Sequence, residues 1–224
     1  MANLYLVGTP IGNLGDITMR ALETFKAVDV IACEDTRHTL KLLTHFGIRK
    51  PLVSCRARNE EEAAKKIVAL LDEGKNIAYA SDAGTPGISD PGAVLVQFAR
   101  KAEHTIIPIP GVSAFTALVS VSGSRDKTLI FEGFLSPKAG RRKTRLTELF
   151  SANAGFVLYE SPYRIVKLLQ DIAEIDKERR ITVGRELTKL HEELISGSAE
   201  EVLNEMAART AIKGEIAVFV SGRS

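Results

Sequence analysis

The hydrophobic residues in the first half of the chain fall into two alternating patterns. Short continuous apolar runs are typical of buried strands, and segments with apolar residues every three or four positions are typical of amphipathic helices. The pattern predicts strands over residues 4–7, 28–33, 51–55, 77–80 and 106–109, and helices over residues 19–27, 39–46, 60–73, 93–102 and 113–121. This alternation predicts a mostly parallel sheet covered by helices.

The second half follows a different order after a polar segment, residues 122–127, which reads as a linker. Beyond it the pattern predicts strands over residues 128–134, 155–159, 180–183, 192–195 and 215–220, and helices over residues 141–150, 162–175 and 198–210. Some of these strands follow one another without a helix between them, which antiparallel strands allow and parallel strands do not. We therefore predict an α/β protein of two α/β domains, residues 1–123 with a mostly parallel sheet and residues 124–224 with a mixed sheet.

The composition is that of a globular protein and excludes several classes. Of the 224 residues, 45% are hydrophobic, and the formal net charge is +2. No segment approaches the roughly 20 apolar residues that cross a bilayer, and residues 1–3 lead into a strand without the basic and apolar regions of a signal peptide. These features predict a cytoplasmic protein. A net charge of +2 is too small by itself to indicate nucleic-acid binding.

The cysteines and histidines show no metal-binding pattern. Cys33 and Cys55 lie in predicted strands without the spacing of metal ligands, and we expect them to be reduced thiols in the core. The four histidines share no spacing with acids or cysteines, so no metal site is predicted; they are His38, His45, His104 and His191.

Residues 81–92 are the most informative segment, because they follow a buried strand and contain three glycines, two prolines and two aspartates. Glycine lets a ligand approach the backbone, proline fixes turns, and aspartate accepts hydrogen bonds from ribose hydroxyls or an amine. Loops at the carboxyl ends of strands are where open α/β sheets bind nucleotide-like ligands. The alternative interpretation is a tight connection in which Ser89 or Asp90 caps the next helix.

Five segments occur in an order and spacing that match a known family: residues 7–16, 34–37, 81–92, 110–114 and 184–189. With them the whole chain resembles the tetrapyrrole-methylase-like (class III) S-adenosylmethionine methyltransferases. The first segment contains Gly-Thr-Pro-Ile-Gly-Asn-Leu-Gly-Asp, where members that act on tetrapyrroles have Gly-x-Gly-x-Gly-Asp. This difference favours the RNA-modifying branch. The resemblance then implies a homodimer that methylates the ribose 2′-oxygen of a cytidine in small-subunit (16S) ribosomal RNA.

The resemblance also implies two α/β domains with S-adenosylmethionine in the cleft between them. Small residues would admit the adenosyl group, Asp82 would pair with a hydroxyl or the ammonium, and Ser113 would offer donors to the carboxylate. The implied cofactor-binding residues are Pro10, Asp82, Ala83, Gly84, Thr85, Ser113, Ala114, Leu187 and Ile216. RNA-modifying members usually continue with a helical segment after the strand matched by residues 216–221, whereas this chain stops at Ser224.

Methyl transfer to a ribose hydroxyl needs an in-line oxygen and a group that accepts its proton. Glu34, Asp35 and Arg37 follow a predicted strand, where carboxylate and guanidinium would orient a hydroxyl and hold a phosphate. The alternative for them is a helix N-cap with a local ion pair. Lys189 would act as a base if its pKa were depressed, and is otherwise a surface lysine. Glu160, at a strand end, is a further candidate.

A one-sided basic run follows the strand predicted to end at residue 134, and no acid occurs from residue 136 to residue 147. Such a run beside a cofactor cleft predicts contacts to RNA phosphates, and its alternative is a solvated helix face. Its cations are Lys138, Arg141, Arg142, Lys143 and Arg145. Two other functions stay open: a small-molecule tetrapyrrole C-methyltransferase of the same fold, and a nucleotide-binding module without catalysis.

Overall fold

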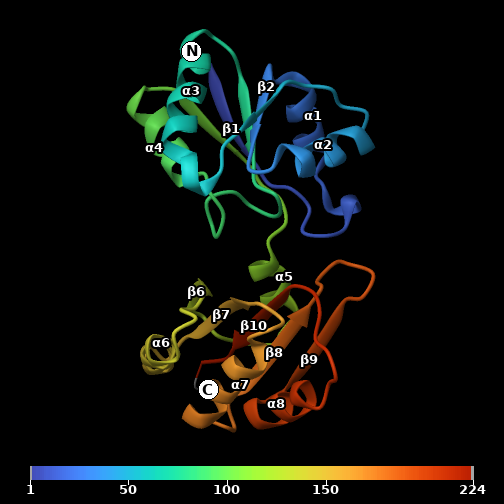
Figure 1. The fold of residues 1–224 in the computed structure, drawn as a ribbon, viewed down its shortest axis with the longest axis vertical. Coiled ribbons are helices and arrows are strands. Elements are labelled where there is room, and N and C mark those ends of the chain that lie inside the picture. The colour runs from blue at the N-terminus through green and yellow to red at the C-terminus, as the bar shows by residue number, and fades with distance from the viewer. Residues whose placement is uncertain (1, 223–224) are drawn as a thin grey trace. The chain divides into compact units, whose positions relative to one another are not determined.

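The computed structural model describes residues 2–222, and its contacts divide the chain into two compact units, Met1–Ser113 and Ala114–Ser224 (Figure 1). The sequence boundary between residues 123 and 124 lies later than this division. The difference is helix α5 (Ala114–Val121), whose Leu118 packs with Val157 and Phe219 of the second unit. No helix within residues 2–222 has the length and apolar composition to cross a membrane.

The first unit contains a five-stranded sheet in the order β3-β2-β4-β1-β5. All of its strands are parallel, where the sequence predicted a mostly parallel sheet. The strands are β1 (Asn3–Val7), β2 (Val30–Cys33), β3 (Leu52–Ser54), β4 (Ile77–Ala80) and β5 (Thr105–Ile109). Every residue of β2 and β4 is buried, because both strands lie inside the sheet and helices cover both of its faces.

Helices cover the first sheet on two sides (Figure 1). They are α1 (Met19–Ala27), α2 (Thr36–His45), α3 (Glu60–Asp72) and α4 (Ala93–Lys101), with short 3₁₀ turns η1 (Leu14–Asp16) and η2 (Ala57–Asn59). Helices α1 and α2 pack in one core cluster with Ala78, whereas α3 and α4 pack in another with Tyr79. Neighbouring residues of a strand point to opposite faces, so the two helix pairs lie on opposite faces of the sheet.

The second unit contains the mixed sheet that was predicted, in the order β6-β7-β10-β8-β9. Its strands are β6 (Leu129–Phe134), β7 (Gly155–Glu160), β8 (Arg180–Arg185), β9 (Glu193–Ser198) and β10 (Ile216–Val220). Helices α6 (Ala139–Ser151), α7 (Ile165–Ile175) and α8 (Ala199–Ala207) pack on the face that includes Phe156, and α5 packs on the face that includes Val157.

The strand directions place several chain ends together in the second unit. Strands β6 and β7 are parallel, and β7 and β8 both run antiparallel to β10. Strands β6, β7 and β8 therefore all end at one edge of the sheet. We call this the second-unit edge; it comprises Phe134, Glu160–Arg164 and Arg185–Leu190.

Candidate functional site

The carboxyl ends of the first unit's parallel strands carry most of the residues that the sequence analysis selected. The loop after β1 leads to α1 on one face of the sheet, and the loop after the adjacent β4 leads to α4 on the other face. Open α/β sheets bind ligands where neighbouring connections diverge in this way. We call this region the first-unit edge; it comprises residues 8–10, 34–35, 81–85 and 110–113.

Backbone hydrogen bonds join the loops after β1 and β4. The Thr9 N–H donates to the Gly84 carbonyl at 2.9 Å, and the Gly84 N–H donates to the Thr9 carbonyl at 3.0 Å. Gly84 has φ +75°, in the left-handed region that favours glycine, and a Cβ there would lie 3.4 Å from Ile11 Cγ2. These bonds bring Pro10, which is buried, close to the segment that begins at Asp82.

The loop after β5 joins the same edge through a contact between two glycines. A Cβ on Gly8 would lie 2.8 Å from the Gly111 Cα, and one on Gly111 would lie 2.9 Å from the Gly8 Cα, so neither position has room for a side chain. The Thr85 hydroxyl donates to the Val112 carbonyl at 3.2 Å. Ser113 follows directly, so the structure brings Pro10, Asp82–Thr85 and Ser113 to one edge.

The carboxylates of Glu34, Asp35 and Asp82 gather at the first-unit edge. The Asp35 N–H donates to Asp82 Oδ1 at 2.9 Å, and the Asp82 N–H donates to the Glu34 carboxylate. Burial raises the pKa of Glu34, and the nearby charges of Asp82 and Asp90 raise it further. Within residues 2–222 neither Glu34 nor Asp82 forms a salt bridge. The edge is therefore suited to a positively charged ligand.

Side chains near this edge cap the N-termini of two helices, α2 and α4. The Asp35 carboxylate accepts from the Arg37 N–H at 2.8 Å and caps α2, which lowers the pKa of Asp35 and is the alternative that the sequence left open. At the start of α4, Glu60 Oε1 accepts from the Gly92 N–H at 2.7 Å and the Val94 N–H at 3.1 Å, and the sequence analysis did not foresee this contribution of Glu60.

Arg56 is a residue of this edge that the sequence analysis missed. Its Nε donates to the Glu34 carbonyl at 3.2 Å, and its charge acts against the raised pKa of Glu34. Arg56 follows strand β3 as Glu34 follows β2. Its position just after a strand is therefore the same signal that indicated Glu34.

The other implied cofactor residues belong to the second unit. Ala114 begins α5, and Leu187 packs against the cluster that contains Leu118. The Ile216 side chain is 4% exposed and lies in the core, so only its backbone is available to a ligand. The cleft between the two domains stays a prediction.

Lys189 and Glu160 are both held by partners at the second-unit edge. Partial burial lowers the pKa of Lys189, but its bonds to Glu186 (2.9 Å) and Glu215 (3.0 Å) outweigh this effect and raise it. A lysine base needs the opposite shift, so this geometry argues against that role. Glu160 is buried, accepts from the Ser161 N–H at 2.7 Å and pairs with Arg164 at 2.6 Å, as a structural carboxylate does.

The basic run lies on and before α6, and three of its five cations are occupied by carboxylates. Arg142 is buried, and its Nε donates to Asp171 at 2.6 Å, so it is not available to a phosphate. Lys143 pairs with Glu174 at 2.6 Å, and Arg145 donates twice to Glu132 at 2.8 Å each. Lys138 and Arg141 are exposed and form no salt bridge within residues 2–222. Arg142 thus departs from the expected phosphate contact.

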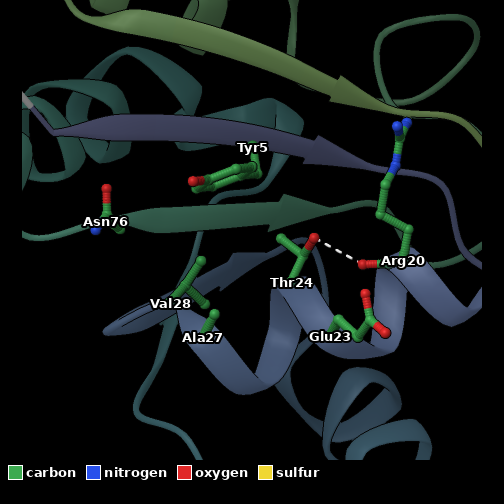
Figure 2. A pocket seen from close by; sticks show the side chains of 7 residues that line it. All are labelled: Tyr5, Arg20, Glu23, Thr24, Ala27, Val28 and Asn76. Atoms are coloured by element: carbon green, nitrogen blue, oxygen red, sulfur yellow. Dashed lines mark hydrogen bonds between the residues drawn. The ribbon is translucent and has the colours of Figure 1, made fainter.

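A pocket of about 230 Å³ elsewhere in the first unit contains none of the selected residues. It lies between α1 and strands β1 and β4, where the Thr24 hydroxyl donates to the Arg20 carbonyl at 2.7 Å (Figure 2). It is lined by Tyr5, Arg20, Glu23, Thr24, Ala27, Val28 and Asn76. Val28 and Asn76 precede β2 and β4, so the pocket lies toward the amino ends of the strands.

The cysteines are buried free thiols, as expected, and burial raises the pKa of Cys55 to about 12. Among the residues that the structure describes, no three His, Cys, Asp or Glu side chains form a group that could hold a metal ion.

Comparisons with known proteins agree in sequence and in fold. A family model described as Tetrapyrrole (Corrin/Porphyrin) Methylases matches residues 3–203. The chain is 44% identical over 222 residues to a protein of Borrelia garinii subsp. bavariensis named "Ribosomal RNA small subunit methyltransferase I", covering 99% of each. Proteins of the same name from Thermotoga maritima and Synechocystis are each 45% identical over 223 residues; the chain covers 100% and 80% of their lengths.

Two solved structures share the fold at low sequence identity. The cobalt precorrin-4 methyltransferase CbiF matches with a TM-score of 0.71 and 16% identity, over 98% of this chain and 94% of that one. The methyltransferase CobJ matches with a TM-score of 0.73 and 16% identity, over 99% and 95%. At this identity the matches establish the fold alone.

Proposed function

Because the chain belongs to the family of tetrapyrrole (corrin/porphyrin) methylases, we propose that it is a methyltransferase acting on small-subunit ribosomal RNA. Relatives at 44% and 45% identity over nearly the whole chain are named for that activity. We propose S-adenosylmethionine as the methyl donor and the ribose 2′-oxygen of a cytidine as the acceptor. The structural observation that carries the proposal is the first-unit edge, where small residues lie together with carboxylates that form no salt bridge within residues 2–222.

The residues of the first-unit edge fit S-adenosylmethionine in charge and in shape. This donor has a sulfonium and an ammonium, so it is attracted to a site with an excess of carboxylates. Asp82 would accept from ribose hydroxyls or the ammonium, and Gly84 would leave space for the adenosyl group. When bound, the cofactor would supply an electrophilic methyl group.

Glu34 is the residue we propose as proton acceptor for the ribose hydroxyl. A general base works best when its pKa lies near the operating pH, and the pKa of Glu34 is shifted upward in that direction. Arg37, three residues further along the chain, is exposed and forms no salt bridge within the described residues, so we propose that it holds an adjacent phosphate. Asp35 caps α2 and positions these two neighbours.

A methylation assay with tritiated S-adenosylmethionine tests the proposal. Small ribosomal subunits from cells that lack this modification, large subunits and a porphyrinoid would each be offered. We expect label in small-subunit RNA only, in alkali-resistant dinucleotides, because a 2′-O-methyl group blocks cleavage of the adjacent phosphodiester. Label in alkali-sensitive mononucleotides would contradict the ribose assignment, label only in the porphyrinoid would favour the tetrapyrrole function, and no transfer would favour a binding module.

We further propose that the protein acts in the cytoplasm as a homodimer, as the family resemblance implies. Ribosomal subunits are its substrate in this proposal, and they are found in that compartment. Light scattering should report twice the mass of the chain at micromolar concentration. A monomer at that concentration would contradict the homodimer.

A further inference from the structure

Two aromatic side chains are exposed at the second-unit edge. Phe134, the last residue of β6, is 61% exposed, and Tyr163, three residues after β7, is 91% exposed. Strands β6 and β7 are parallel neighbours, with Phe134 opposite Tyr159. Both exposed rings therefore project from one edge of one sheet. Large apolar groups gathered on a surface often mark a binding site.

The Phe134 ring is oriented by a row of aromatic contacts. It meets Tyr159 edge-on with ring centroids 5.8 Å apart, and Tyr159 meets Phe131 at 5.1 Å. Phe131 in turn meets Phe115 of α5 at 5.5 Å. A ring supported in this way loses little conformational freedom when another ring stacks on its free face.

Exposed cations follow Phe134 in the chain. Lys138 and Arg141, at the start of α6, form no salt bridge within residues 2–222, unlike the three paired cations of the same run. Positive charges that follow an exposed ring within a few residues of the chain complement a ligand that combines planar apolar groups with negative charges. Unpaired nucleotides have this combination, because their bases are free to stack and their phosphates are negative.

We propose that Phe134, Lys138, Arg141 and Tyr163 form a surface that binds single-stranded RNA. The rings stack on unpaired bases, and the two cations contact phosphates. Duplex RNA does not use the rings, because its bases are already stacked and paired. This inference rests on the proposed function in taking RNA as the substrate, and it adds which nucleotides are bound and by which residues.

Binding of a fluorescein-labelled 12-nucleotide single-stranded RNA without self-complementarity, measured by fluorescence anisotropy, tests the surface. We expect Phe134→Ala and Tyr163→Ala each to weaken binding of the single strand about tenfold, within the range known for loss of one base stack. Phe134→Trp should retain affinity, because it keeps an aromatic face. Leu129→Ala is the matched control, since Leu129 is also exposed but lies at the opposite end of β6.

Binding of the same RNA annealed to its complement separates the contribution of base stacking from the contribution of charge. The ring variants should bind the duplex like the wild type, whereas Lys138→Ala and Arg141→Ala should weaken both forms. Wild-type protein that binds single strands no better than duplex would overturn the inference. Equal loss in Leu129→Ala and Phe134→Ala would also overturn it.

Failure of this inference can be told apart from failure of the proposed function. If wild-type protein methylates small subunits and the ring variants keep the same KM for subunits, the inference is wrong and the function stands. If the ring variants lose single-strand binding but the wild type methylates no RNA, the inference stands and the function is wrong. The alternative is that this surface binds a second copy of the chain, and light scattering tests it. Ring variants that become monomeric while their RNA affinity is unchanged would assign the surface to that second copy and overturn the inference.

Discussion

The first-unit edge and the second unit differ in how far their charged residues are paired. At the first-unit edge, Glu34 and Asp82 lie together without salt-bridge partners among residues 2–222, and the pKa of Glu34 is raised. On helix α6 and at the end of β8, most charges are paired, as in Arg142 with Asp171 and Lys189 with Glu186. Like charges that remain together oppose folding, so their presence indicates a role outside stability. Paired charges need no such role.

This contrast separates residues that look alike in the sequence. Arg141 and Arg142 are adjacent, yet one is exposed and the other is buried against Asp171. Glu34 and Glu193 are both glutamates beside a strand end, yet their pKa values shift in opposite directions. Four substitutions, taken from the largest expected effect to the smallest, test this contrast.

Arg142→Ala should lower the free energy of unfolding by about 3 kcal/mol, because the buried Asp171 keeps only its longer pair with Lys143, at 3.5 Å. Urea denaturation measures this change. Arg141→Ala is the matched control and should stay within about 0.5 kcal/mol of the wild type. In RNA binding the two variants should show the opposite order of effects. Only Arg141→Ala is expected to reduce the salt dependence, lowering the slope of log affinity against log salt concentration by about one unit. Equal stability of the two variants would show that the pairing of Arg142 is unimportant.

Glu34→Gln should reduce the methyl-transfer rate about a hundredfold, the lower end of what general-base catalysis contributes. In the wild type the rate should fall as pH falls through the raised pKa of Glu34, because the protonated form is not a base. A carboxyl whose folded-state pKa is raised makes folding less favourable when it ionises. The free energy of unfolding of the variant at pH 7 should therefore be at least as high as that of the wild type. A large loss of stability would instead indicate a structural carboxylate.

Gly84→Val should weaken binding of S-adenosylmethionine at least tenfold, about 1.4 kcal/mol, because it adds a branched side chain in the proposed cofactor site. Gly84 has φ +75°, so the substitution also strains the backbone. Gly47→Val controls for that strain, since Gly47 has φ +67° and nothing lies within 4 Å of the added Cβ. Calorimetry on both folded variants gives the comparison; equal affinities would remove Gly84 from the cofactor site.

Glu193→Gln should lower the free energy of unfolding at pH 7 by about 1 kcal/mol, allowing for solvent screening of a partly exposed group. Hydrogen bonds from Arg209 and Arg185 lower the pKa of Glu193 to about 2. Its stabilisation is therefore complete above the unfolded-state pKa of about 4.3 and is lost as pH falls toward 2. Urea denaturation should show the difference between variant and wild type shrinking between pH 6 and pH 3. Glu178→Gln, at a weak 3.9 Å pair, is the control.

The hydrophobic pattern alone predicted the strands, the helices and both sheet types, because these depend on which residues are buried and on the spacing of buried residues along the chain. The observed elements differ from the predicted ones where a particular side chain caps a helix or packs against another element. Helix α2 begins three residues earlier than the apolar pattern predicts, because Asp35 caps it. Helix α5 joins the second unit because its Leu118 packs there, which a linker-like sequence after it did not reveal.

The ends of the strands could be located from the sequence, whereas the pairs that charged side chains form across the fold could not. Glu34 and Asp82 follow neighbouring strands, so their proximity follows from the sheet order. The partner of Arg142 is Asp171 on α7, and no local pattern shows which face of α6 that helix covers. A run of cations without nearby acids in the sequence therefore does not establish that those cations are free.

The contact between Gly8 and Gly111 also limits how such a sequence can evolve. A mutation at either codon adds a Cβ that meets the backbone of the other residue, and the other residue has no side chain left to remove. No second substitution at that partner can restore fitness, so the pair offers no compensatory route. Two such positions would not covary among descendants, and the contact would escape any method that infers proximity from correlated change. Saturation mutagenesis would detect it instead, as two distant codons that both tolerate only glycine.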